Sequence, residues 1–316
     1  MAQIVLGMGT SHAGFGGPER WAESAKRDMT NARGGGMPMN LDIPRMVEER
    51  KDWIGKELTP DAWERRYAAV QAAVATLSNV FAETAPDAVV VIGDDTHEVF
   101  TPEEHIPAVD VFWGDSVRWI PRAGRTPTPE RLRELPGKPE LGERLIGSLI
   151  DEGFDISHTR EFPPDRTIGH AFDFVYSAIM RNNVPPHVPI WLNTYYFPNV
   201  PTLKRCYALG KALGRAIESW DSDQRVAVIA SGGFSHLVID ETLDRGVLAA
   251  LQDKDEQTLT GLPEEPFIFG TSEIRSWLVM AGAMHDTDAS MNLVCYAPCY
   301  RTPAGTGCAA TFGYWN

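Results

Sequence analysis

The chain alternates short apolar runs with longer stretches in which apolar residues recur every three or four positions. The short runs predict buried strands at residues 4–8, 88–92, 109–113, 188–192 and 226–230. The periodic stretches predict helices, and the longest begins at Thr59 with apolar positions at Trp63, Tyr67, Val70, Val74, Leu77 and Phe81. Further helices are predicted at 141–153, 202–220, 240–254 and 271–284, and two closing strands at 293–300 and 305–312.

Strands that alternate with helices are typical of an α/β protein with helices on both faces of one sheet. We therefore predict a single three-layer αβα domain over residues 1–316, with a central mixed sheet. Residues 13–58 include Gly34-Gly35-Gly36 and predict an excursion beside the first strand, with a short helix around Pro44 to Lys56. Residues 120–140 are rich in Pro and Arg and predict a surface loop.

A histidine follows three of the predicted strands. His12 stands in Gly9-Thr10-Ser11-His12, His97 follows the strand at 88–92, and His236 ends Ser231-Gly-Gly-Phe-Ser-His236. The loops that leave the carboxyl ends of strands are where α/β proteins usually present reactive groups. Three such placements indicate a shared site rather than three separate loop histidines.

The composition narrows the function classes. The net charge is −14, and no stretch supplies the clustered Lys and Arg that contacts to nucleic-acid phosphates require. No stretch approaches the roughly 20 consecutive apolar residues that cross a bilayer, and no basic region precedes the first apolar run. We therefore expect no nucleic-acid partner, no membrane span and a cytoplasmic enzyme.

Two histidines and one carboxylate from separate loops form the ligand set of a mononuclear Fe(II) site with open positions. His12 and His97 supply the imidazoles, and Glu273, in the first turn of the last predicted helix, supplies a carboxylate. A vicinal diol can chelate such an ion while O2 binds beside it. A third histidine that does not bind the metal, such as His236, can take a phenolic proton near neutral pH. His170, between Gly169 and an aromatic run, is a further candidate.

Three segments together resemble the catalytic subunits of the class III extradiol ring-cleavage dioxygenases. They are Gly9-Thr-Ser-His12, Ser231-Gly-Gly-Phe-Ser-His236 and Gly270-Thr-Ser-Glu273-Ile-Arg-Ser-Trp277. The resemblance runs from the first strand to about residue 312. It implies an enzyme that inserts both atoms of O2 into a catechol-type ring, protocatechuate- or gallate-like, beside the hydroxyl pair. It also implies a homo-oligomer, with or without a small accessory subunit.

The same resemblance implies roles for individual residues. His12 and Glu273 become iron ligands, and His236 becomes the acid–base histidine. His170 becomes a substrate-contacting histidine, and the segment that contains Arg301 and Thr306 borders the substrate pocket.

The second iron histidine departs from the family pattern. In the family this histidine lies four residues before a phenylalanine, and the residue in that position relative to Phe100 is Thr96. His97 follows one residue later, so three interpretations stay open. His97 binds through a rearranged loop, Asp95 or Glu98 replaces it, or the chain holds no functional iron.

This departure leaves two other functions open beside the Fe(II) dioxygenase. One is a non-catalytic relative that acts as a binding or subunit-pairing protein on the same scaffold. The other is a zinc-dependent hydrolase that uses His12, His97 and Glu273 around an activated water.

Overall fold

The computed structural model describes residues 1–12, 16–29, 41–121 and 129–316. Within these residues, a central mixed sheet follows the strand order β10-β11-β1-β8-β2-β7-β3-β6, and β9 pairs with β11. A separate hairpin joins β4 to β5. The strands are β1 (Gln3–Thr10), β2 (Ala88–Gly93), β3 (Val109–Phe112), β4 (Ser116–Trp119), β5 (Arg133–Pro136), β6 (Ser157–Thr159), β7 (His187–Leu192), β8 (Arg225–Ser231), β9 (His236–Val238), β10 (Met291–Tyr300) and β11 (Thr306–Trp315).

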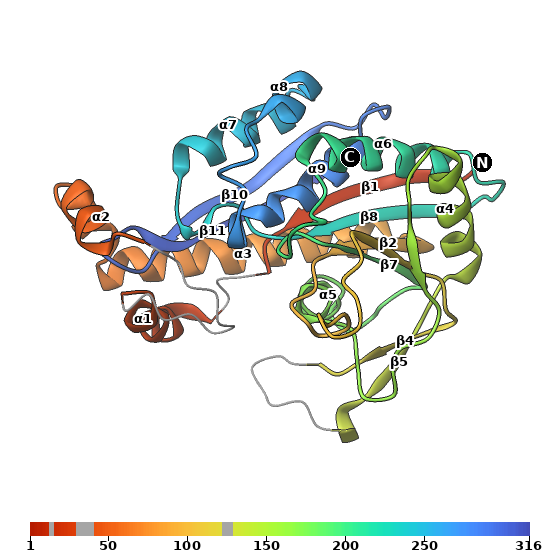
Figure 1. The fold of residues 1–316 in the computed structure, drawn as a ribbon, viewed down its shortest axis with the longest axis horizontal. Coiled ribbons are helices and arrows are strands. Elements are labelled where there is room, and N and C mark those ends of the chain that lie inside the picture. The colour runs from red at the N-terminus through yellow and green to blue at the C-terminus, as the bar shows by residue number, and fades with distance from the viewer. Residues whose placement is uncertain (13–15, 30–40, 122–128) are drawn as a thin grey trace.

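Helices cover both faces of the sheet (Figure 1). The side chains of β2 show why both faces of the sheet need a cover. Successive residues of a strand point to opposite faces of the sheet. Val90 and Ile92 pack into one apolar core with α4, α6, α7, α8 and α9, whereas Val89 and Val91 pack into another with α1, α3 and α5. The helices are α1 (Gly17–Asp28), α2 (Ile43–Arg50), α3 (Pro60–Thr84), α4 (Pro139–Asp151), α5 (His170–Phe174), α6 (Leu203–Glu218), α7 (Glu241–Gln252), α8 (Glu256–Gly261) and α9 (Ile274–Ala283).

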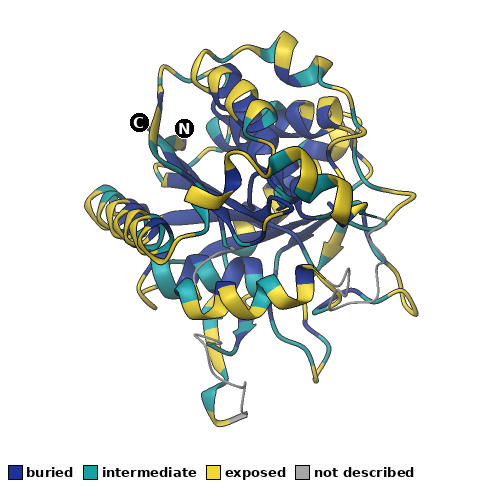
Figure 2. Ribbon diagram, turned by 90° about the vertical axis from the view of Figure 1, so that its left-hand side faces the viewer, coloured by how far each residue is buried: buried dark blue, intermediate teal, exposed yellow. Residues whose placement is uncertain are grey.

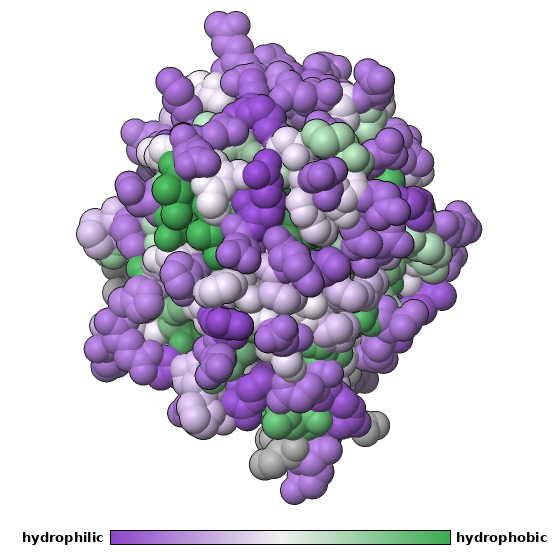
Figure 3. Space-filling view, turned by 90° about the vertical axis from the view of Figure 1, so that its right-hand side faces the viewer, coloured by the Kyte–Doolittle hydropathy of each residue, from purple (hydrophilic) through white to green (hydrophobic). Residues whose placement is uncertain are grey.

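Burial follows the three layers. The strands are dark blue at the centre of Figure 2, and the outward faces of the helices are yellow. All six residues of β2 and all six of β7 are buried, as expected for strands covered on both faces. The face in Figure 3 is mostly polar, with apolar side chains in small separate groups. Among the described helices, none is both long and apolar enough to cross a bilayer.

The predicted α/β fold with a central mixed sheet is confirmed. Each predicted strand and long helix has a counterpart, and Thr59 caps α3 by accepting a hydrogen bond from the backbone N–H of Ala62 at 3.2 Å. The loop predicted at 120–140 is wrong for Arg133–Pro136, which forms β5 and pairs with β4. Two predicted segments lie at least partly outside the described residues: residues 122–128 of that loop, and Gly34-Gly35-Gly36 of the excursion.

Several short elements were not predicted. Helix α1 lies within the expected excursion, and the strands β4, β6 and β9 have only three or four residues each. The excursion does contain the expected short helix near Pro44, because α2 spans Ile43–Arg50.

The sheet topology places the strand exits side by side. β8 lies between β1 and β2 and is parallel to both, so the three strands leave the sheet at the same edge. This edge carries His12 after β1, Asp94 after β2 and Ser231 at the end of β8. Ligand sites of open α/β sheets lie outside the carboxyl ends of the strands.

Candidate metal centre and active site

His12, Asp94 and His170 converge at this edge of the sheet. One potential ligand atom from each residue lies within 4.8 Å of the other two. The carboxylate of Asp94 stands between the imidazoles, 3.8 Å from Nε2 of His12 and 3.8 Å from Nε2 of His170. The two rings meet edge to face, with their centroids 4.6 Å apart. Two imidazoles and one carboxylate in this arrangement can hold a divalent transition-metal ion.

The carboxylate of Asp94 is buried without a hydrogen bond. Neither of its oxygens has a hydrogen-bond partner among the described residues, and the side chain is 1% exposed. Burial, followed by the charge of Glu273, raises the pKa of Asp94 to about 8. An unsatisfied buried carboxylate is costly and rare in folded proteins. A cation bound between Asp94 and the two imidazoles would remove that cost.

The imidazole of His12 presents an unprotonated nitrogen to the cluster. The hydroxyl of Ser231 donates to the carbonyl of Ala171 at 2.7 Å, so its oxygen accepts from Nδ1 of His12 at 3.2 Å. Nε2 is therefore the nitrogen that carries the lone pair. Burial lowers the pKa of His12 to about 4, which keeps the ring neutral. A metal ligand needs this tautomer, and an outer partner on the second nitrogen commonly fixes it.

The imidazole of His170 has a carboxylate behind it. Nδ1 of His170 lies 3.0 Å from each oxygen of Glu98, and its backbone N–H donates to Oε1 of Glu98 at 2.9 Å. Burial alone would lower the pKa of His170, but Asp94 and Glu98 outweigh it and raise the pKa to about 10. Burial likewise opposes the ionisation of Glu98, yet its hydrogen bond and charge pairing with His170 lower its pKa well below the usual range. Glu98 therefore orients Nε2 of His170 toward Asp94.

Glu273 adjoins the cluster and joins it to His236. One oxygen of Glu273 lies 3.4 Å from Nε2 of His12 and accepts the backbone N–H of Gly233 at 2.7 Å. The other oxygen lies 3.1 Å from Nε2 of His236 and accepts the hydroxyl of Tyr195. Burial would raise the pKa of Glu273, but the adjacent His236 and His12 hold it well below its usual value. Glu273 is thus an ionised carboxylate between two histidines.

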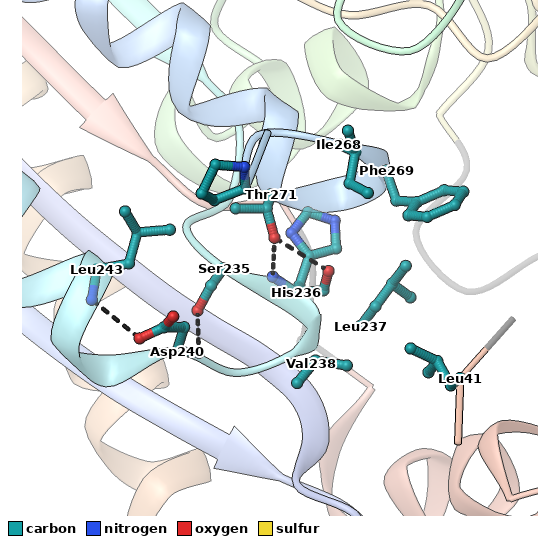
Figure 4. Close-up of a pocket in the computed structure, with 11 residues that line it drawn as sticks. Leu41, Ser235, His236, Leu237, Val238, Asp240, Leu243, Ile268, Phe269 and Thr271 are labelled. Atoms are coloured by element: carbon teal, nitrogen blue, oxygen red, sulfur yellow. Dashed lines mark hydrogen bonds between the residues drawn. The ribbon is translucent and has the colours of Figure 1, made fainter. Parts of the chain in front are cut away.

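The ring of His236 lies in a slot between two glycines. A Cβ at Gly270 would come within 2.0 Å of Cδ2 and Nε2 of His236, and a Cβ at Gly233 within 2.9 Å of Nδ1. Nδ1 donates to the carbonyl of Phe234 at 2.9 Å, which leaves Nε2 as the nitrogen that exchanges a proton. The His236 side chain also lines a pocket bordered by Thr271 and Phe269 (Figure 4).

Two of the residues selected from the sequence lie in the loop after β2 but turn away from the cluster. His97 is exposed at φ 67°, stacks on Tyr196 with ring centroids 4.0 Å apart, and its Nδ1 lies 3.2 Å from the carbonyl oxygen of Phe100. Asp95 accepts the backbone N–H groups of Val99 and Phe100 at 3.0 and 3.1 Å. The recorded contacts of these two side chains are thus within their own loop and with Tyr196, whereas Asp94 is the residue of this loop that lies 3.8 Å from Nε2 of His12.

Two residues of the site, Asp94 and Tyr195, were not predicted from the sequence. The sequence position of Asp94 could have identified it as a site residue, because it is the first charged residue after the apolar run of β2. Tyr195 follows β7 in the same way, within Asn193-Thr-Tyr-Tyr. The exit of β7 carries no histidine, and at the exit of β2 the predicted ligand was His97, three residues after Asp94.

Arg301 and Thr306 form contacts with the first helix. Arg301 pairs with the carboxylate of Asp28 at 2.9 Å, and the hydroxyl of Thr306 donates to the same carboxylate oxygen at 2.9 Å. Thr306 also lies 2.8 Å from the hydroxyl of Thr302. These contacts tie the β10–β11 hairpin to α1, and the substrate-binding roles of Arg301 and Thr306 stay predictions.

Comparison with known proteins adds an independent observation. Residues 58–306 match the family model described as the catalytic LigB subunit of aromatic ring-opening dioxygenase. Over 195 residues, 57% of this chain and 54% of the relative, the chain is 34% identical to a gallate dioxygenase of Pseudomonas putida. Over 168 residues, 53% of this chain and 49% of the relative, it is 29% identical to a 2,3-dihydroxyphenylpropionate/2,3-dihydroxicinnamic acid 1,2-dioxygenase of Comamonas testosteroni. The chain thus spans about half the length of the curated relatives that it matches.

Proposed function

The chain belongs to the family of catalytic LigB subunits of aromatic ring-opening dioxygenases, and on this premise we propose that it is an Fe(II)-dependent extradiol dioxygenase. The substrate is a catechol-type ring, and the bond that breaks is the ring C–C bond beside the hydroxyl pair. Both atoms of O2 enter the product, a muconate semialdehyde-like acid. The homo-oligomer and the accessory subunit expected from the resemblance stay predictions.

The observation that carries the proposal is the buried carboxylate of Asp94, which has no hydrogen bond and lies 3.8 Å from Nε2 of each of two imidazoles. We assign His12, Asp94 and His170 as the residues that hold the iron. Both imidazoles direct Nε2 toward Asp94, and both have an outer partner on Nδ1. An Fe(II) ion held by these three residues would supply a Lewis acid for a chelating catecholate and a reduced metal able to activate O2.

The resemblance implies that Glu273 is an iron ligand, and one distance supports this alternative. An oxygen of Glu273 is 3.4 Å from Nε2 of His12, a separation that suits two ligands of one ion. The same oxygen already accepts a backbone N–H, however, whereas both oxygens of Asp94 lack a hydrogen bond. We therefore assign Asp94 as the carboxylate ligand and Glu273 as the group that positions His236.

His236 supplies the acid–base step. With Nδ1 committed to the carbonyl of Phe234, Nε2 takes the second phenolic proton of the substrate and later returns it. Glu273, 3.1 Å from Nε2, stabilises the imidazolium that forms. Tyr195 donates its hydroxyl to the same Glu273 oxygen and so holds the carboxylate in place.

Oxygen uptake by protein reconstituted anaerobically with Fe(II) tests the function over a panel of catechols. We expect uptake with at least one catechol and a ring-opened, coloured product. No uptake on any catechol would refute the dioxygenase. Stoichiometric iron would refute the non-catalytic relative, and activity with zinc that persists in air would favour the hydrolase.

Two variants separate the roles of the histidines. His236→Ala should abolish turnover and keep the iron content, because this residue moves a proton and does not bind the metal. His12→Ala should lose the iron. Equal iron loss in both variants would show that His236 is a ligand and not the base.

A further inference from the structure

An apolar pocket of about 240 Å³ lies beside His236 (Figure 4). Its walls come from the turn that begins at Ser235, from the segment before Thr271 and from residue 41. Most of the lining is aliphatic or aromatic: Leu41, Leu237, Val238, Leu243, Pro266, Ile268 and Phe269. The polar members are Ser235, His236, Asp240 and Thr271.

We propose that this pocket receives an uncharged, apolar substituent on the catechol ring, so that the protein selects alkyl- or aryl-substituted catechols over carboxylated ones. The inference rests on the proposed function, since it takes His236 as the residue that faces the substrate ring. Because the same imidazole lines the pocket, a substituent can extend from the ring into this space.

The charged groups around the pocket disfavour the binding of a substituent that carries a carboxylate. The described residues that line it include no Lys or Arg, and the acidic residue among them, Asp240, caps α7 by accepting the backbone N–H of Leu243 at 3.0 Å. Glu273 adds a second carboxylate 3.1 Å from the His236 ring. A carboxylated substituent would lose its hydration here without gaining a counter-charge from the described residues of the lining.

Arg301 does not supply a positive charge to the lining of this pocket. The resemblance implies that the segment with Arg301 borders the substrate pocket, where a guanidinium would attract a carboxylate. Its guanidinium instead lies 2.9 Å from the carboxylate of Asp28 and is already compensated. Arg301 is also absent from the described lining of the pocket.

The size and exposure of the pocket suit a substituent and not a whole ligand. Sites for complete drug-sized ligands usually enclose roughly 300–1,000 Å³, and this pocket is smaller. Ile268, in its wall, is 43% exposed although it is a large apolar residue. An alkyl or aryl group in the pocket would bury part of that side chain and gain the corresponding hydrophobic free energy.

Anaerobic titration calorimetry with matched ligands tests the pocket without relying on turnover. The two pairs are 4-propylcatechol with 3,4-dihydroxyphenylacetate, and 3-propylcatechol with 2,3-dihydroxyphenylacetate. The members of each pair have similar size and differ in the charge of the substituent. In at least one pair we expect the neutral ligand to bind about tenfold more tightly, the effect of burying a few methylene-sized groups.

Ile268→Arg introduces a cation into the wall of the pocket. We expect it to reduce the preference for the neutral ligand about tenfold or to reverse it. Ile150→Arg is the control, because Ile150 is 54% exposed on α4 and lies outside the described lining. This control should leave the preference unchanged.

Equal or tighter binding of the carboxylated ligand by the unmodified protein would overturn the inference. An equal effect of Ile268→Arg and Ile150→Arg, or no binding of any of the four catechols, would also overturn it. Oxygen uptake is recorded separately on the same ligands. Selective binding without uptake would refute the proposed dioxygenase function and leave the pocket assignment standing, whereas uptake without selectivity would refute only the pocket assignment.

Discussion

One carboxylate oxygen of Glu98 accepts the backbone N–H of His170 at 2.9 Å and lies 3.0 Å from Nδ1 of the same residue. Glu98 lies in the loop after β2, and His170 begins α5, 72 positions later in the sequence. Through this pair, the loop after β2 fixes both the position of α5 and the rotation of the His170 ring. Because a metal-binding imidazole needs a fixed tautomer, we interpret Glu98 as the outer partner of a ligand and not as a ligand.

Glu98→Gln should weaken metal binding without removing a ligand. Glutamine keeps an oxygen for the backbone N–H of His170 but lacks the charge that raises the basicity of its ring. We expect the affinity for Fe(II), measured by anaerobic competition with a chelator, to fall about 10–100-fold. Glu104→Gln is the matched control, because Glu104 pairs with Arg166 at 2.7 Å near the surface and should leave metal affinity unchanged. Unaltered affinity in Glu98→Gln would show that the pair is structural only.

Asp94→Asn and Asp95→Asn should differ in their effect on iron binding, although the two residues are adjacent. Asp94→Asn removes the charge of the carboxylate between the imidazoles, so we expect the iron content after reconstitution to fall to about a tenth of the unmodified value or less. Asp95→Asn should retain the iron and lower the free energy of unfolding by about 1 kcal/mol, because a capping carboxylate is replaced by a weaker acceptor.

Metal analysis and urea unfolding of both variants check this pair of outcomes. Retention of iron in Asp94→Asn together with its loss in Asp95→Asn would reverse the assignment. His97→Ala completes the set, and iron retained in this variant would agree with the exposed position of His97 on Tyr196.

Asp94 and His97 show which features of the site could be predicted from the sequence and which could not. The apolar run of β2 predicted the strand and its exit, because a continuous run of that length is typical of a strand buried on both faces. Side-chain direction beyond the exit depends on the turn. Asp95 bonds to two backbone N–H groups ahead of it, and His97 adopts a positive φ of 67°. Residue spacing along the chain does not encode this geometry.

His170 illustrates a second limit. The sequence made His170 a candidate, and the resemblance added a substrate-contacting role, but its place beside Asp94 depends on contacts made far away in the sequence. Arg118 of β4 donates to the backbone carbonyls of Pro163 and Pro164 at 2.9 and 2.7 Å and holds the preceding loop. Strand β4 has four residues, too few for a periodic pattern to predict it. The position of His170 therefore follows from tertiary packing that local periodicity does not report.

Gly270→Ala should lower turnover while leaving the metal site intact. A Cβ at this position would meet the His236 ring at 2.0 Å, so the ring must leave its slot. A displacement of about 1 Å in a catalytic group can cost about a hundredfold in rate, and we expect a fall in kcat of that order. Gly261→Ala is the control, because a Cβ there meets nothing within 4 Å. Unchanged kcat in Gly270→Ala would show that the orientation of His236 does not limit the reaction.

Asp244→Asn should destabilise the protein more at acidic than at neutral pH. The buried carboxyl group of Asp244 accepts the backbone N–H and the hydroxyl of Ser235 at 3.0 and 2.6 Å, and the hydroxyl of Tyr296 at 2.7 Å. Burial raises its pKa from 3.8 to about 6. The folded protein therefore binds this proton more tightly than the unfolded chain does. The resulting stability is fully present below pH 3.8 and is lost as the pH rises to about 6.

Asparagine does not titrate, so the loss of stability caused by Asp244→Asn should be roughly 2 kcal/mol greater at pH 4.5 than at pH 7.5. Urea unfolding of both proteins at the two pH values measures this difference. Tyr296→Phe provides a second check, because it removes a hydrogen bond that stabilises the ionised carboxylate and should extend the loss of stability to higher pH. A difference between Asp244→Asn and the unmodified protein that stays constant with pH would show that Asp244 is ionised throughout this range. In that case, the turn before His236 would be held by a charged group rather than by a protonated one.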